Sequence, residues 1–253
     1  TRSQQQQQYK QRQQLRQRCL RMSAASASFK LYGNQGTRSP LVNWYLEEIN
    51  APYEQIDATR VDRSSYASDG SGYPHPFGSI PAAADAGGVQ LFESGAILHY
   101  LALKTSSFIG NNNTDYHETM KWLMWQMGGL GPMAGQAHHF LKYAPNMTPP
   151  ADIPYAKNRY RVEVKRLYGV LNENLERRDF VAGQFFSIAD MAIWPWATLW
   201  KRQDQDINLF PNIKKWLERC ENRPGVQNGR KLLQNKRSRI ETDKQAQKIL
   251  FKN

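Results

Sequence analysis

Ile80 and Pro81 are the first residues whose types and order suggest a binding site. A proline within a strand cannot donate a hydrogen bond to a β ladder, so this edge would face something other than a neighbouring strand. A cis bond before Pro81 would turn the amide and carbonyl of Ile80 outward, where they could pair with the backbone of a peptide. The alternative is an ordinary turn proline, since most X–Pro bonds are trans.

Glu93 and Ser94 open an apolar segment that we predict to be a helix over residues 94–104. The free amides and the dipole of a helix N-terminus bind carboxylates, and the Ser94 hydroxyl would add a donor. Glu93 could accept a hydrogen bond from an ammonium group of the ligand. The alternative is that Ser94 merely caps the helix. Together with Ile80–Pro81, the pair predicts a site for a small anionic peptide.

A third group of polar residues occupies the loop 33–40, which precedes a predicted helix starting at Pro40. Thr37 is the first choice and Ser39 the second for a hydroxyl that stabilises an anion, and Arg38 could add positive potential. Either hydroxyl could instead cap the helix, which is a common role for both residue types.

The elements that must position these groups follow a β-α-β and then a β-β-α order. We predict strands at 29–33 and 53–56 around a helix at 40–50, an irregular loop at 58–74, a hairpin of 81–84 with 90–92 around the turn 85–88, and the helix 94–104. From about residue 115 onward the chain is predicted to be helical, with long amphipathic stretches at 116–128 and 154–175. Ser187 and Asp190 form a predicted capping box for the next helix.

This order predicts an α/β domain at 29–105 followed by an all-α domain at 115–230. Residues 1–28 form a basic, Gln-rich extension with too little apolar surface to fold alone, and 231–253 form a basic C-terminal extension. Three interpretations of the first segment stay open: an upstream extension, an organelle-targeting segment or a docking arm. The expected location is the cytoplasm, or a mitochondrion or plastid if the segment is a targeting signal.

The net charge of +12 is concentrated at the two ends of the chain. Residues 1–29 contain six Arg or Lys and no acidic residue, residues 230–253 contain eight and two, and the part between them is neutral. A neutral body without a base-reading module argues against nucleic-acid binding. No apolar run approaches the roughly 18 residues of a membrane helix, so membrane insertion is not expected. The two cysteines, Cys19 and Cys220, make no metal or disulfide pattern.

Residues 29–230 resemble a cytosolic-type glutathione transferase, with a thioredoxin-like domain before the helical one. The segments 125–140 (WQMGGLGPMAGQAHHF) and 155–163 (YAKNRYRVE) are similar to the bacterial nu class and to the fungal nitrogen-regulator prion proteins. The resemblance implies a homodimer and glutathione as cofactor. It also implies conjugation of electrophiles or glutathione-dependent reduction of disulfides, with the thiolate stabilised by Thr37 or Ser39.

The resemblance also implies which residues contact the ligands. Ile80, Pro81, Glu93 and Ser94 would bind glutathione, and Arg159 would reach the site from the helical half. The substrate pocket would be lined by Trp125, Gln136, His139 and Phe140.

The chain departs from the family pattern at three places. Ser79 stands where the family commonly has a lysine that helps to hold the glycyl end of glutathione, although we retain Ser79 as a binding candidate. The loop 58–74 replaces a more regular segment, and Thr37-Arg-Ser replaces the Thr-Pro-Asn of the nu class. These departures keep an alternative open: a non-catalytic interaction subunit that docks in a larger assembly through its basic ends.

No metal site is predicted, because the adjacent His138 and His139 would point about 100° apart on a helix.

Overall fold

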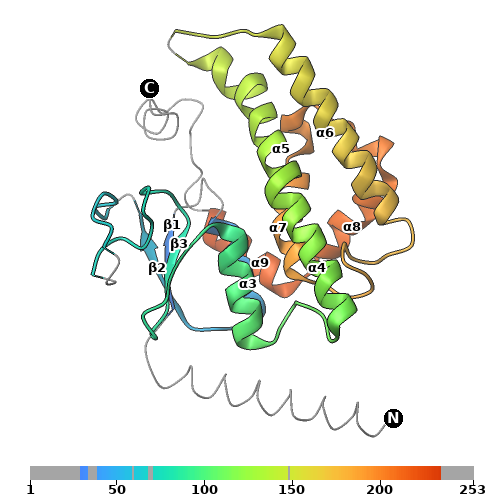
Figure 1. The fold of residues 1–253 in the computed structure, drawn as a ribbon. Coiled ribbons are helices and arrows are strands. Elements are labelled where there is room, and N and C mark those ends of the chain that lie inside the picture. Colours follow the sequence, from blue (N-terminus) through green and yellow to red (C-terminus); the bar gives the residue numbers. More distant parts are fainter. Residues whose placement is uncertain (1–28, 34–38, 59, 68–70, 148, 235–253) are drawn as a thin grey trace, which may run out of the picture. The chain divides into compact units, whose positions relative to one another are not determined.

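The computed structural model describes residues 29–33, 39–58, 60–67, 71–147 and 149–234, and for 230–234 the backbone only. These residues form two compact units (Figure 1). The first ends at Ile109 and also includes Pro224–Leu233, and the second contains Gly110–Arg223. Thr37 and Arg38 and both basic ends of the chain lie outside the described residues.

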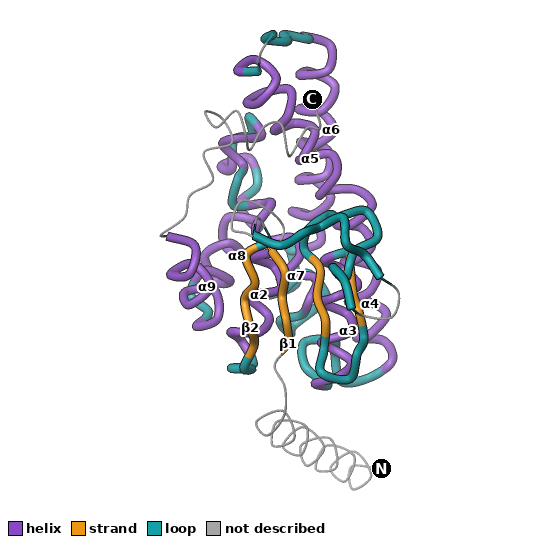
Figure 2. The backbone as a smooth tube through the Cα atoms, turned by 90° about the vertical axis from the view of Figure 1, so that its left-hand side faces the viewer, coloured by secondary structure: helices purple, strands orange, loops and turns teal. Residues whose placement is uncertain are grey.

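The first unit is built on a four-stranded mixed sheet (Figure 2). Its strands are β1 (Phe29–Gly33), β2 (Tyr53–Asp57), β3 (Ala82–Ala84) and β4 (Gln90–Phe92), in the order β2-β1-β3-β4. β1 runs parallel to β2 and antiparallel to β3, and β4 closes the hairpin with β3. Leu31 on β1 is fully buried and pairs in register with the equally buried Ala83 on β3.

Helices α2 (Ser39–Glu48) and α3 (Ser94–Thr105) pack against each other and supply the rest of this core. Leu41, Val42 and Leu46 of α2 and Ile97 and Leu98 of α3 are almost completely buried. Such positions each stabilise the fold by about 1.5–3 kcal/mol through the removal of apolar surface from water.

Helix α9 (Pro224–Gln234) also belongs to the first unit. At Gly225 an added Cβ would lie only 2.4 Å from Cγ of Glu48, so α9 and the end of α2 are in close contact. The expected bounds placed residues 224–230 in the all-α domain and 231–233 in the C-terminal extension, whereas the structure groups Pro224–Leu233 with the sheet.

The second unit is entirely helical. Its main helices are α4 (Asn113–Trp125), α5 (Gly131–His138), α6 (Pro154–Asn174), α7 (Ile188–Ala197) and α8 (Pro211–Glu221). Two π-helical segments, η1 (Gln126–Leu130) and η2 (His139–Tyr143), connect α4, α5 and the short 3-10 helix η3 (Ala144–Asn146) without a break, and two further 3-10 helices, η4 (Trp200–Gln203) and η5 (Ile207–Leu209), precede α8. α6 packs along α5, while α7 contacts α4, α5 and α8 (Figure 1).

The predicted α/β half followed by an all-α half is confirmed, as are the strands, the hairpin and the capping box of Ser187 with Asp190. The described residues of the loop 58–74 contain neither helix nor strand, as expected. None of the helices among the described residues is long and apolar enough to cross a membrane.

Candidate functional site

Ile80 and Ser94 lie together at the open end of the β3–β4 hairpin. The last residue pair of that hairpin is Ala82 with Phe92. Ile80 lies two residues before Ala82, and Ser94 lies two residues after Phe92. The Ile80–Pro81 bond is cis, Pro81 is buried and Ile80 is half-buried. Ser94 is 1% exposed and is the first residue of α3. The structure therefore brings the two predicted binding elements to one end of the sheet.

Glu93 has an unusual backbone conformation, with φ 64° and ψ 116°, immediately before α3. Non-glycine residues rarely adopt positive φ, and such strain of order 1–3 kcal/mol often marks functional sites. The Glu93 side chain is exposed and does not cap the helix. The N-terminal amides of α3 are thus not capped by the Glu93 carboxylate.

Asp85 fixes the hairpin to α3. Its carboxylate accepts hydrogen bonds from the amides of Gly87 and Val89, from the Tyr100 hydroxyl and from Lys104, whose Nζ lies at 2.5 Å. Desolvation would raise the pKa of Asp85, but the bonds from Lys104 and Tyr100 outweigh it and lower the pKa to about 2. Since Tyr100 and Lys104 belong to the C-terminal half of α3, this cluster ties the hairpin turn to that part of the helix.

Ser39 is 1% exposed at the start of α2 and lies against the end of β1. An added Cβ at Gly33 would lie 1.9 Å from the Ser39 hydroxyl oxygen, so only glycine permits this approach. Ser39 is thereby packed into the first unit. Thr37, the first choice for the anion-stabilising hydroxyl, is not among the described residues.

Two further residues contact the site and were not predicted from the sequence. The Tyr73 hydroxyl donates a 2.8 Å hydrogen bond to the carbonyl of Ser79, and Arg63 Nη1 donates a 3.1 Å bond to the carbonyl of Gly78. Both come from the irregular loop that precedes Ile80. Ser79 itself is exposed. No periodicity or motif in this loop could have indicated these contacts.

His75 lies close to the Glu93 side of the site. It is 4% exposed, its ring packs 4.8 Å from that of Phe92, and its Nδ1 accepts a hydrogen bond from the Phe77 amide. Burial lowers the pKa of His75 although the Glu93 carboxylate raises it. His75 is therefore expected to be a neutral, structural residue near pH 7.

The other predicted site residues belong to the second unit. Arg159 is exposed on α6, with Nη1 3.9 Å from Glu163. Trp125 ends α4 with its ring 5.1 Å from that of Trp122, and Gln136 is exposed on α5. Because a helix rises about 1.5 Å per residue, Trp125 and Gln136 are separated by roughly 15 Å along the run of α4, η1 and α5.

His139 and Phe140 begin the π-helical segment η2. Phe140 stacks on Tyr160 of α6 at 5.4 Å with an interplanar angle of 6°, and His139 meets Phe140 edge-on. Burial lowers the pKa of His139. π-helical segments frequently accompany functional sites, and η1 and η2 lie on either side of α5, which carries Gln136.

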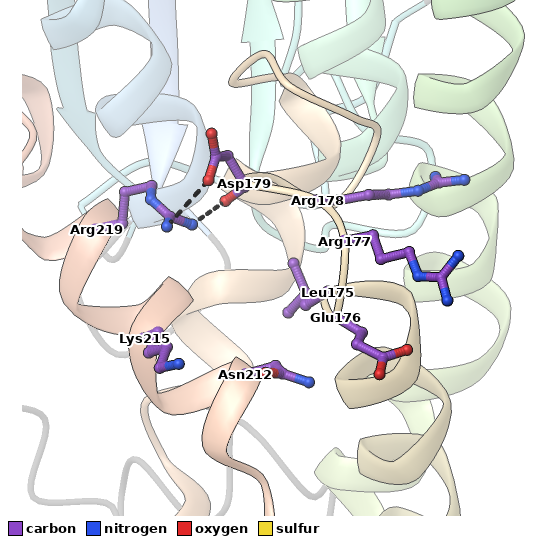
Figure 3. A pocket seen from close by; sticks show the side chains of 8 residues that line it. All are labelled: Leu175, Glu176, Arg177, Arg178, Asp179, Asn212, Lys215 and Arg219. Atoms are coloured by element: carbon purple, nitrogen blue, oxygen red, sulfur yellow. Dashed lines mark hydrogen bonds and ion pairs between the residues drawn. The ribbon is translucent and has the colours of Figure 1, made fainter.

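A small cavity of about 230 Å³ lies elsewhere in the second unit, between residues 175–179 and α8 (Figure 3). Asn212, Lys215 and Arg219 line it from α8. Two of the cationic side chains that line the cavity form ion pairs: Arg219 lies 3.1 Å from Asp179, and Arg178 lies 3.2 Å from Glu118. The cavity contains none of the predicted site residues, so we do not assign the ligand to it.

The chain matches known proteins over both units. The family models "Glutathione S-transferase, N-terminal domain" and "Glutathione S-transferase, C-terminal domain" match residues 27–103 and 137–224. The disulfide-bond oxidoreductase YfcG of Escherichia coli (strain K12) is 48% identical over 157 residues, which are 60% of this chain and 71% of that protein. The disulfide-bond oxidoreductase YghU of the same organism is 36% identical over 68% of this chain, which spans 61% of that protein.

Solved structures agree with these matches. A glutathione transferase from Burkholderia graminis, crystallised with two glutathione molecules per subunit, has a TM-score of 0.69 and 33% identity, over 83% of this chain and 90% of that one. The glutathione transferase URE2P6 from Phanerochaete chrysosporium, in complex with oxidized glutathione, has a TM-score of 0.71 and 29% identity, over 84% and 99%.

The architecture is thus that of a thioredoxin-like domain followed by a helical domain, which confirms the fold class expected from the sequence. The chain belongs to the glutathione S-transferase family.

Proposed function

We propose that the protein binds glutathione at the open end of the β3–β4 hairpin. The thiolate of the bound glutathione would then reduce disulfides or attack electrophiles. The observation that carries the proposal is the buried Ser94 at the N-terminus of α3, placed at the same end of the sheet as Ile80. The amides of the first helical turn suit the α-carboxylate of the γ-glutamyl end, and Ile80 suits the cysteinyl backbone. Relatives named as disulfide-bond oxidoreductases and neighbours crystallised with glutathione support this choice.

Disulfide reduction needs no cysteine of the protein. The thiolate of one glutathione attacks a sulfur of the substrate disulfide, which releases one thiol and leaves a mixed disulfide. A second glutathione then attacks this mixed disulfide, so that the second thiol leaves and glutathione disulfide forms. Within the described residues the cysteine is Cys220, which is fully buried, and the sequence has no CxxC pair. The glutathione sulfur is therefore the better candidate for the reacting atom.

Pro81, Glu93 and Ser79 would border the ligand, and Arg159 would approach it from the helical unit, with Trp125, Gln136, His139 and Phe140 lining the substrate side. Thr37 would donate to the thiolate, since the buried Ser39 packs against Gly33. We assign the chain to the nu class or its fungal nitrogen-regulator relatives and expect a homodimer.

Replacing Ser94 by alanine is expected to weaken glutathione binding roughly 10- to 150-fold, because a hydrogen bond to a charged group is worth about 1.5–3 kcal/mol. Isothermal titration calorimetry of the full chain with glutathione measures this change. Thr114→Ala is the matched control, since Thr114 is an exposed hydroxyl in the first turn of α4. Equal affinities of Ser94→Ala and the wild type would remove Ser94 from the site. A wild type that is folded but does not bind glutathione would contradict the proposal and favour the non-catalytic interaction subunit.

Replacing Thr37 by valine is expected to raise the pKa of the bound thiol toward its ordinary value of about 8.5, because the valine cannot donate to the thiolate. Ultraviolet absorbance of the thiolate during a pH titration of the complex reports this pKa. Ser39→Ala in parallel distinguishes the two hydroxyls. A bound thiol that titrates identically in Thr37→Val and in the wild type would exclude Thr37 from this role.

A further inference from the structure

Two consecutive carbonyls that precede Ile80 are each held by a side chain of the same loop. Arg63 Nη1 lies 3.1 Å from the carbonyl oxygen of Gly78, and the Tyr73 hydroxyl lies 2.8 Å from that of Ser79. Both bonds are partly shielded from water. The loop is irregular, yet it supplies two directed donors to the backbone next to the candidate site.

Tyr73 is well fixed for this role. It is 3% exposed, its ring meets that of Tyr32 on β1 edge-on at 5.5 Å, and its amide donates to the Ser65 carbonyl. Desolvation raises the pKa of Tyr73 to about 12, so the hydroxyl keeps its proton near neutral pH. The buried and fixed ring of Tyr73 thus directs a neutral hydroxyl donor at the carbonyl of Ser79.

Gly78 lets the chain approach Arg63 closely. Its φ of 62° is in the left-handed region, and an added Cβ would lie 2.8 Å from the backbone oxygen of Arg63. Glycine meets both demands, the positive φ and the close approach. The turn is further closed by the Gly78 amide, which donates to the His75 carbonyl at 3.1 Å.

The carbonyl of Ser79 and the amide of Ile80 belong to one planar peptide unit. In a trans peptide the C=O and N–H groups point in opposite directions, so fixing one fixes the other. The hydrogen bond from Tyr73 to the Ser79 oxygen therefore sets the direction of the Ile80 N–H. In the same way, Arg63 sets the direction of the Ser79 N–H through the Gly78 carbonyl.

We propose that Tyr73 is a positioning residue that aims the Ile80 amide at the backbone of a bound peptide ligand, and that Arg63 supports it by fixing the preceding peptide unit. The inference rests on the proposed binding of glutathione at this end of the hairpin. Holding the amide in its binding direction before the ligand arrives lowers the entropic cost of association. Arg63 and Tyr73 would then contribute to binding through the backbone that they hold.

The test measures glutathione affinity and steady-state kinetics of the full chain. Tyr73→Phe removes one hydroxyl and should weaken binding roughly 3- to 10-fold, the effect of one neutral hydrogen bond. KM for glutathione should rise by a similar factor with kcat unchanged, because the lost interaction is the same in the ground and transition states. Tyr66→Phe is the matched control, from the same loop with a side chain that is 43% exposed.

A second pair of variants tests Arg63. Arg63→Gln should weaken binding roughly 2- to 5-fold, and Arg63→Lys, which can still donate to the Gly78 carbonyl, should restore much of it. Arg60→Gln is the control, since Arg60 is an exposed loop cation paired with Asp57. If Tyr73→Phe fails to fold, Arg63→Gln and its lysine rescue test the same role.

A direct readout comes from nuclear magnetic resonance of protein labelled with 15N-isoleucine. The Ile80 amide signal of the free protein should shift in Tyr73→Phe and stay in place in Tyr66→Phe, with an unchanged melting temperature. If the wild type binds glutathione and both tyrosine variants bind it equally well, the positioning role is wrong while the proposed function stands. If the wild type itself does not bind, the proposed function fails and this inference fails with it.

Discussion

Asp190→Ala is expected to lower the free energy of unfolding of the helical unit by about 3–5 kcal/mol, the range seen when one partner of a buried polar network is removed. Asp190 is completely buried at the start of α7. Its carboxylate accepts hydrogen bonds from the amides of Val181 and Ser187, the Ser187 hydroxyl and Trp216 Nε1, at 2.8–3.0 Å. Alanine would leave these donors buried without an acceptor.

The network matters because it joins three separate segments of the helical unit. The Ser187 amide belongs to the capping box of α7, Val181 lies in the preceding turn, and Trp216 is a fully buried residue of α8. Desolvation raises the pKa of Asp190, while its four donors favour the ionised form. Removal of the carboxylate therefore has two effects: α7 loses its capping box, and the hydrogen bond that joins Asp190 to Trp216 of α8 is lost.

Chemical denaturation followed by tryptophan fluorescence measures the effect. Asp115→Ala is the matched control, because Asp115 also lies in the first turn of a helix but its bonds to Asn111 and Asn112 are exposed. That control is expected to cost about 1 kcal/mol or less. A loss below about 1.5 kcal/mol in Asp190→Ala would show that the network is not a main source of stability.

Several elements of the fold were predictable because each has a local signal. The capping box of Ser187 and Asp190 and the hairpin around Asp85 are both marked by residue types at fixed spacing, and both are present in the structure. Helix α9 shows the limit of such signals. Helix is expected from about residue 115 onward, but the sequence does not say which unit this last helix packs on, and in the structure Gly225 lies against Glu48 of α2.

The residues of the candidate site were likewise predictable only in part. Ile80 and Ser94 could be placed from sequence, since a strand, a turn and a helix in that order bring them to one end of a sheet. Tyr73 and Arg63 could not, because their bonds span 6 and 15 residues of an aperiodic loop. The positive φ of Glu93 was equally hidden, since glutamate rarely adopts it and nothing in the sequence marks the exception.

His138 leads to the second large prediction, a loss of stability on mild acidification. It is 5% exposed on α5, its ring lies 5.9 Å from that of Trp196, and its Nε2 has no hydrogen-bond partner among the described residues. Burial, followed by the charges of Arg202 and Lys142, lowers the pKa of His138 to about 4. The buried imidazole is therefore neutral near pH 7.

The sign of the effect follows from proton binding. Above pH 6.5 the imidazole is neutral in both states, so His138 adds no pH dependence. As the pH falls from 6.5 to about 4, the unfolded chain takes up the proton and the folded protein does not, so the free energy of unfolding falls. The difference in pKa corresponds to about 3 kcal/mol, and the loss levels off below pH 4.

His138→Phe keeps a ring of similar size against Trp196 and removes the titrating group. We expect the loss of stability between pH 7 and pH 4.5, measured by urea denaturation, to be smaller by about 2–3 kcal/mol in this variant than in the wild type. At pH 7 the variant should be at least as stable, because it also removes a buried nitrogen that lacks a partner. His117→Phe on the exposed face of α4 should keep the wild-type dependence. If His138→Phe loses as much stability in acid as the wild type, the sensitivity arises from other groups and the neutral, buried state of His138 contributes nothing to it.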